Sequence, residues 1–183
     1  AVRGWGILPL GLLGIIIIIA YTPWVTRRPL LCLLAPGLGF GPLMVMGTHY
    51  VLTGGYDVVA LLASLVPGFL VSNLLLLNQF PDLEADAEVQ RRHIPIIMGR
   101  AVGARLYAAL ALAAYLVVVL AWIFGSFPPG TLIALLGLPL ALLTIKGVLH
   151  YADRIDKLIP YLGKNVLYTL ATPFLLGIGF MIS

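Results

Sequence analysis

Long apolar segments follow one another along this chain, separated by short stretches that carry nearly all of its charge. Of the 183 residues, 61% are hydrophobic and only 10% are charged. A water-soluble domain needs a surface that is about 25–35% charged, and disordered chains combine low hydrophobicity with high charge. We therefore expect an integral membrane protein. The net charge of +4 does not indicate a nucleic-acid partner, because no basic stripe lies on a polar face.

The apolar segments have the length of membrane-spanning helices. A helix needs about 20 apolar residues to cross about 30 Å of hydrocarbon. Six segments meet this requirement, and we expect the spans approximately at 4–25, 30–51, 58–79, 101–124, 129–148 and 165–183. They lack the alternating pattern of membrane β-strands. The predicted fold is therefore all-α, a polytopic bundle of six transmembrane helices that forms a single domain over 1–183.

Basic residues gather in three of the loops between these segments. Ten of the eleven Lys and Arg residues follow the first, third or fifth segment, and only Arg3 lies on the other side. Lys and Arg are enriched in the cytoplasmic loops of membrane proteins. Loops 26–29, 80–100 and 149–164 are therefore predicted to be cytoplasmic, and both ends of the chain are predicted to face outward.

Small residues are frequent in the second segment. Gly37, Gly39 and Gly41 allow neighbouring helices to approach closely, and we favour this packing role over the alternative that they line a cavity. Cys32 also lies in an apolar run. A single cysteine in such a place is interpreted as a small buried hydrophobic residue.

Four of the seven acidic residues fall between positions 82 and 88, at the end of the third segment. At 100° per residue, Asn78, Asp82 and Asp86 share one helix face, and the two glutamates of this stretch point to the other side. Pro81 is expected to break or kink the helix beside Asp82. One amide and two carboxylates are hard oxygen ligands of the kind that Mg²⁺ binds, with water and substrate phosphates completing its shell.

A pair of arginines, Arg91 and Arg92, follows this acidic stretch directly. Guanidinium groups bind phosphate oxygens in a bidentate manner and stay charged. Carboxylates for Mg²⁺ next to two arginines predict a site for a diphosphate. The alternative is an ordinary solvated loop, but a row of polar side chains at a membrane interface is costly without a function.

Further polar residues have weaker interpretations. In the last basic loop, His150 and Asp153 share a helical face that could bind a metal, but a solvated loop in which Asp153 pairs with Lys157 is favoured. His49 is interpreted as an interface residue. His93 lies beside the arginines and is not included among the site residues.

The acidic stretch and the arginine pair together resemble the second aspartate-rich motif of UbiA-type intramembrane prenyltransferases. The stretch 41–54 is most similar to the branch of this family that prenylates 1,4-dihydroxy-2-naphthoate in menaquinone synthesis. The segment Tyr21-Thr22-Pro23 is similar to a tyrosine-containing cytoplasmic loop of the family. These similarities cover most of the chain.

The chain also departs from the family pattern. Where the family has Gly-Lys-Arg-Thr after the second motif, this chain has Gln90-Arg91-Arg92-His93, so the charges are kept without the turn glycine. Family members have nine membrane helices and a first motif, Asn-Asp-x2-Asp-x3-Asp, which does not occur here. The six predicted spans would correspond to helices four to nine, and we expect the chain to hold half of an active site.

The resemblance implies transfer of a polyprenyl group from a polyprenyl diphosphate to an aromatic acceptor, with Mg²⁺ as cofactor. Asp82 and Asp86 are then the catalytic metal ligands, and Asn78 supports them. The residues implied to bind the diphosphate are Arg91, Arg92, Tyr21, Arg28 and Lys164. The expected location is the inner membrane of a bacterial or archaeal cell, with the active-site loops cytoplasmic and the lipid bilayer around the helices.

Several alternatives stay open at this point. The acceptor could be 4-hydroxybenzoate or a porphyrin-type compound in place of the naphthoate. A transporter could use Asp82 and Asp86 as ion or proton sites, although acids near the middle of a span would then be expected. A non-catalytic membrane protein is the third alternative, and the missing first motif favours it.

Overall fold

The computed structural model describes residues 4–183, and in that range the chain is almost entirely helical and contains no strand. This confirms the predicted all-α fold class. The α-helices in chain order are α1 (Leu8–Tyr21), α2 (Pro29–Leu38), α3 (Met44–Thr53), α4 (Val58–Asn78), α5 (Leu83–Glu88), α6 (Ile94–Met98), α7 (Arg100–Ile123), α8 (Leu138–Tyr151) and α9 (Ile155–Met181).

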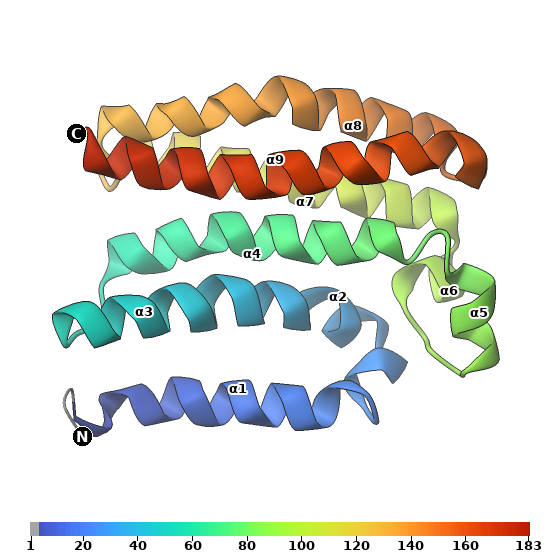
Figure 1. Cartoon of the computed structure of the whole chain (residues 1–183), viewed down its shortest axis with the longest axis horizontal. Coiled ribbons are helices and arrows are strands. Elements are labelled where there is room, and N and C mark those ends of the chain that lie inside the picture. Colours follow the sequence, from blue (N-terminus) through green and yellow to red (C-terminus); the bar gives the residue numbers. More distant parts are fainter. Residues whose placement is uncertain (1–3) are drawn as a thin grey trace.

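The long helices lie side by side along the longest axis of the molecule, and the short helices α5 and α6 lie together at one end (Figure 1). α4 is central, because it packs against α2, α7 and α9. α1 lies at one edge of the bundle, with apolar side chains such as Ile16, Ile18 and Ile19 exposed. Exposed apolar side chains on an outer helix suit contact with lipid.

Four helical segments of the described chain are long and apolar enough to cross a membrane, namely Pro29–Thr53, Val58–Asn78, Arg100–Ile123 and Pro129–Tyr151. The apolar segment Trp5–Tyr21 is shorter, and α9 is not among the four. The molecule is thus an integral membrane protein, and the count of six spans is not confirmed. The segment Pro29–Thr53 stays helical past Pro42 through a π-helical turn at Gly39–Leu43, which joins α2 to α3.

Two of the predicted loops contain more helix than expected. The range 80–100 holds α5 and α6, and most of 149–164 is helical because α8 continues to Tyr151 and α9 begins at Ile155. Charged residues show where a chain leaves the hydrocarbon. They do not by themselves end a helix, since Lys and Glu are good helix formers.

Inside the bundle, buried polar side chains connect α4, α7 and α9. The Tyr107 hydroxyl donates to Asn165 Oδ1 at 3.0 Å, and the hydroxyls of Tyr107 and Tyr168 lie 2.8 Å apart. Asn73 Nδ2 donates to the Tyr168 hydroxyl at 3.0 Å. Helices in lipid gain little from apolar burial alone, so such hydrogen bonds help to specify how they associate.

Two of the glycines in the second predicted span lie against α4. A Cβ atom on Gly41 would come within 2.6 Å of the Ser64 carbonyl oxygen and 2.7 Å of Gly68 Cα, and a Cβ on Gly37 would overlap Gly68 and Ser72. A Cβ on Gly39 would meet nothing within 4 Å. The packing role is therefore confirmed for Gly37 and Gly41 and does not apply to Gly39.

This difference predicts that an alanine substitution lowers stability at Gly41 and does not lower it at Gly39. Gly41→Ala should lower the free energy of unfolding by about 1–3 kcal/mol, because the new methyl group overpacks the contact with α4. Gly39→Ala should not lower it. Thermal unfolding of the purified protein in one detergent measures both variants, and equal stability of the two would contradict the close contact at Gly41.

Candidate functional site

The acidic stretch lies where α4 ends. α4 stops at Asn78, a turn follows, and α5 begins at Leu83 directly after Asp82. The fully buried ring of Phe80 anchors this turn in the bundle. The predicted break at Pro81 is confirmed, as the fixed φ and missing N–H of proline favour. The predicted single helix face is therefore wrong, because Asn78 ends α4, Asp82 lies in the turn and Asp86 belongs to α5.

The turn nevertheless brings the three predicted ligands to one small cavity, which we call the acid cavity. Its volume is about 110 Å³. Its lining residues are Tyr21, Thr26, Cys32, Leu75, Asn78, Gln79, Asp82, Asp86, Arg91 and His93. Cys32 is buried as predicted, and Gln79 Nε2 donates to its sulfur at 3.5 Å. Residues from two stretches of the sequence, 21–32 and 75–93, thus meet around the two aspartates.

Asp86 is the buried carboxylate of this cavity, and both of its oxygens have partners. The Arg91 guanidinium donates to Oδ1 at 2.7 Å, and His93 Nε2 lies 3.1 Å from Oδ2. A buried carboxylate needs such partners to offset its loss of hydration. Asp82 is exposed, and within residues 4–183 no ion pair holds it. The two predicted metal ligands therefore differ in environment.

His93 is the residue of this site that sequence reasoning left out. Its side chain is only 2% exposed, and Nδ1 has no hydrogen-bond partner within the described chain. Burial lowers the pKa of His93 below its ordinary value, and the hydrogen bond and charge of Asp86 oppose that shift. In the neutral imidazole, the contact with the carboxylate places the proton on Nε2. His93 thus orients Asp86.

The loop that carries the arginines turns at Gln90, where the Gly-Lys-Arg-Thr pattern described above has glycine. Gln90 has a φ of 60° and is the one residue other than glycine with a positive φ among those described. The Arg91 amide donates to the Asp86 carbonyl oxygen at 3.0 Å, and the Arg92 amide donates to the Thr26 carbonyl oxygen at 2.9 Å. The left-handed backbone at Gln90 directs the chain from α5 back toward the segment that follows α1.

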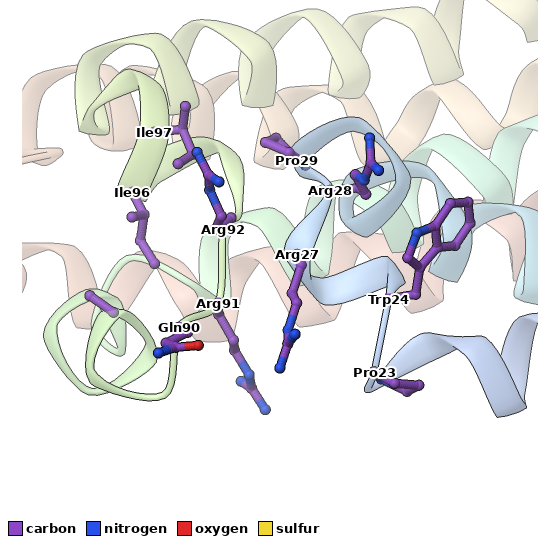
Figure 2. A pocket seen from close by; sticks show the side chains of 11 residues that line it. Pro23, Trp24, Arg27, Arg28, Pro29, Gln90, Arg91, Arg92, Ile96 and Ile97 are labelled. Atoms are coloured by element: carbon purple, nitrogen blue, oxygen red, sulfur yellow. The ribbon is translucent and has the colours of Figure 1, made fainter.

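A larger cavity of about 870 Å³, which we call the arginine cavity, adjoins this loop. Figure 2 shows its two walls, one with Arg27 and Arg28 and the other with Arg91 and Arg92. Among the described residues, no aspartate or glutamate lines it. Arg91 lines both this cavity and the acid cavity.

Of the two arginines on the first wall, Arg28 was predicted as a site residue and Arg27 was not. The Arg28 guanidinium lies 5.7 Å from the centre of the Trp24 ring, which suits a cation–π contact. Arg27 was not among the predicted site residues, although it stands next to Arg28 in the same basic loop. Only the tertiary structure places it opposite Arg91 and Arg92.

An apolar groove of about 420 Å³ lies on another side of the acid cavity. Its lining residues are Ile17, Ile18, Tyr21, Thr22, Ala35, Pro36, Gly39, Phe40 and Leu75. Tyr21 and Leu75 line both the groove and the acid cavity. A ligand with a charged head and a long apolar tail could therefore contact the polar and the apolar parts of this region at once.

Lys164 lies apart from these three cavities and lines none of them. Its ammonium nitrogen is 4.6 Å from the centre of the Tyr161 ring on α9. The structure therefore brings Tyr21, Arg28, Arg91 and Arg92 to the region of the two aspartates and does not bring Lys164 there. The implied contact of Lys164 with a diphosphate stays a prediction.

The donor set of the acid cavity fits Mg²⁺ as a partial site. In the described part of the chain, no three His, Cys, Asp or Glu side chains form a group that would hold a metal ion by themselves. Asp82, Asp86 and the Asn78 amide instead offer two carboxylates and one amide oxygen around one cavity. Mg²⁺ is commonly bound by one or two carboxylates, with waters and substrate phosphates as its other ligands.

The chain is similar in sequence to known proteins. The sequence model of the UbiA prenyltransferase family matches residues 1–161. The chain is 27% identical over 165 residues to the 1,4-dihydroxy-2-naphthoate octaprenyltransferase of Bacillus subtilis (strain 168). That match covers 90% of this chain and 50% of the relative, so the chain spans about half of that protein's length. No solved structure matches the chain significantly.

The backbone at Gln90 generates a stability prediction. Gln90→Gly should be at least as stable as the wild type, and Gln90→Val should lose about 1–2 kcal/mol, because a β-branched residue is strained at positive φ. At Ala85, an exposed residue inside α5, the order should be reversed, because glycine is the poorer helix former. Chemical unfolding in detergent measures all four variants, and the same order at both positions would contradict the left-handed turn.

Proposed function

This chain belongs to the UbiA prenyltransferase family, and we propose that it acts in the transfer of a polyprenyl group from its diphosphate to an aromatic ring. We propose 1,4-dihydroxy-2-naphthoate as the acceptor, because the stretch 41–54 resembles that branch and the Bacillus subtilis relative carries this compound in its name. The basic loops favour a cytoplasmic position for the end of the bundle that carries the site.

The observation that carries this proposal is the order of the three adjoining cavities. The arginine cavity shares Arg91 with the acid cavity, and the acid cavity shares Tyr21 and Leu75 with the apolar groove. A polyprenyl diphosphate has the same order of chemistry, with an anionic head, a reacting carbon and a long apolar tail. The head would contact the arginines and the tail would occupy the groove.

The reaction breaks the bond between C1 of the prenyl chain and the bridging oxygen, and the electron pair leaves with the diphosphate. A ring carbon of the acceptor then attacks the allylic cation, and the ring loses a proton. The chain's own contribution is to stabilise charge that develops on the leaving group, which guanidinium groups do best in a site shielded from water. Arg27, Arg28 and Arg92 line the arginine cavity and would take this task, and Arg91 would contact both the phosphates and Asp86.

Asp82, Asp86 and Asn78 would hold Mg²⁺ in this site. When bound, the ion supplies Lewis-acid stabilisation of the leaving diphosphate. His93 keeps Asp86 in place through its Nε2 contact, as residues behind a metal ligand commonly do. The apolar groove excludes water from the allylic carbon, which prevents simple hydrolysis.

Substitution of the two aspartates tests the proposal directly. Asp82→Asn and Asp86→Asn should each reduce prenyl transfer by at least about 100-fold, because each removes a charge that the reacting site depends on. The assay follows prenylation of 1,4-dihydroxy-2-naphthoate by octaprenyl diphosphate and Mg²⁺, with the complete gene product that contains this chain.

Matched controls are available on α5 itself. Glu84 and Glu88 are exposed acids of the same short helix and do not line the acid cavity. Glu84→Gln and Glu88→Gln should leave the rate unchanged. Full activity in both aspartate variants would refute the proposed site, whereas equal loss in all four variants would indicate a general effect of charge on α5.

The arginine cavity generates a separate prediction for Arg27. Arg27→Gln should raise KM for the polyprenyl diphosphate about tenfold, the effect of losing one hydrogen bond to a charged group, with a smaller change in kcat. Inhibition by inorganic pyrophosphate should weaken in parallel. Arg105→Gln is the matched control, since Arg105 is exposed on α7 and lines none of the three cavities. An unchanged KM in Arg27→Gln would remove this residue from the site.

A further inference from the structure

A fourth cavity lies between α8 and α9 and shares no lining residue with the three described above. Its volume is about 380 Å³. The residues that line it are Leu143, Lys146, Gly147, His150, Tyr151 and Tyr161. α8 ends and α9 begins at the same end of the bundle as α5 and α6 (Figure 1). We call this space the lysine–tyrosine cavity.

Two tyrosine rings form one side of this cavity. The ring centres of Tyr151 and Tyr161 are 6.0 Å apart at an interplanar angle of 32°. Gly147 makes this arrangement possible, because a Cβ atom there would overlap the Tyr161 ring. The edge of His150 packs on Tyr151 with ring centres 4.6 Å apart. The aromatic side of the cavity therefore depends on a close contact between the two helices.

Three lysines lie near these rings, and of the three only Lys146 lines the cavity itself. Lys146 lines the cavity, the Lys157 ammonium lies 5.9 Å from the centre of the Tyr151 ring, and the Lys164 ammonium lies 4.6 Å from the centre of the Tyr161 ring. Aromatic faces attract cations without neutralising their charge. The lysines thus stay available to an anion.

No carboxylate compensates this positive charge in the described part of the chain. Asp153 and Asp156 belong to the connection between the helices and the start of α9, yet neither forms a salt bridge with these lysines there. The cavity itself has no acidic lining residue. Its chemistry therefore complements an anion of moderate size at one end of a membrane protein.

We propose that the lysine–tyrosine cavity binds the phosphate headgroup of an anionic phospholipid. Tyrosine and lysine are typical of the interface between membrane and water, and basic cavities between membrane helices bind anionic headgroups. Leu143 is a half-exposed apolar residue toward the middle of α8, where the first carbons of an acyl chain would follow the headgroup. The lining residues of this cavity are separate from those of the three cavities proposed for prenyl transfer.

The test measures lipid retention by the full chain in neutral detergent micelles, with native mass spectrometry as the readout. Phosphatidylglycerol and phosphatidylcholine are titrated separately, because they share acyl chains and differ in headgroup charge. The wild type should retain one phosphatidylglycerol with clear preference over phosphatidylcholine. Lys146→Gln should weaken phosphatidylglycerol binding about fivefold, the effect of one lysine near an anionic lipid, and Lys146→Gln/Lys157→Gln/Lys164→Gln should abolish the preference.

Two further variants, a competing anion and an unfolding measurement show whether the binding is specific to this cavity. Arg105→Gln removes a cation from α7 and should retain the preference. Gly147→Ala keeps every charge but displaces the Tyr161 ring, and it should weaken binding in the way Lys146→Gln does. Inorganic pyrophosphate should not displace the lipid, and a thermal unfolding curve for each variant shows that it is folded.

The proposal is overturned if the wild type retains both lipids equally or if the triple lysine variant keeps the preference. Displacement of phosphatidylglycerol by inorganic pyrophosphate would identify a site for free phosphates and also overturn it. Loss of the preference in Arg27→Gln/Arg28→Gln/Arg92→Gln, with retention in the lysine variants, would assign lipid binding to the arginine cavity. Each of these results is readable whether or not the chain catalyses prenyl transfer.

Discussion

The absence of hydrogen-bonding solvent in hydrocarbon governs this structure. A backbone that crosses the membrane must satisfy its own N–H and C=O groups, so it forms helices. Irregular backbone is tolerated only at the ends of the helices or where protein covers it. The break between α4 and α5, the turn at Gln90 and the link from α1 to α2 all occur at one end of the bundle. The acid cavity and the arginine cavity lie at that end as well.

At this end of the bundle, the buried carboxylate of Asp86 has partners, whereas several cations have no carboxylate beside them. Asp86 is buried and accepts hydrogen bonds from Arg91 and His93, which offset the free energy lost when its carboxylate leaves water. The arginine cavity and the lysine–tyrosine cavity carry cations without carboxylates on their walls. Cations that have no carboxylate partner favour an anionic ligand. We therefore propose a substrate diphosphate for the first cavity and a lipid headgroup for the second.

Much of the site was accessible from the sequence because its key residues are neighbours in the chain. Asn78, Asp82 and Asp86 were identified from spacing and residue type alone, and the structure brings them to one cavity. Their arrangement was not accessible, since Pro81 breaks the helix and a periodic pattern cannot show the direction of the chain after a break. His93 was missed because a histidine beside two arginines has no distinguishing pattern. Its burial against Asp86 depends on packing among several helices.

The sequence by itself determined that this protein lies in a membrane, that it is helical, and in which stretch the acids and arginines gather. Hydropathy and local charge are properties of consecutive residues. Only the tertiary structure decided which residues from distant segments meet. Arg27 faces Arg91 and Arg92 across a cavity, Tyr21 connects the acid cavity to the apolar groove, and Lys164 lies beside Tyr161. These contacts depend on how helices pack, and helix packing is set by shape and by close approach at residues such as Gly41 and Gly147. No local pattern records that information.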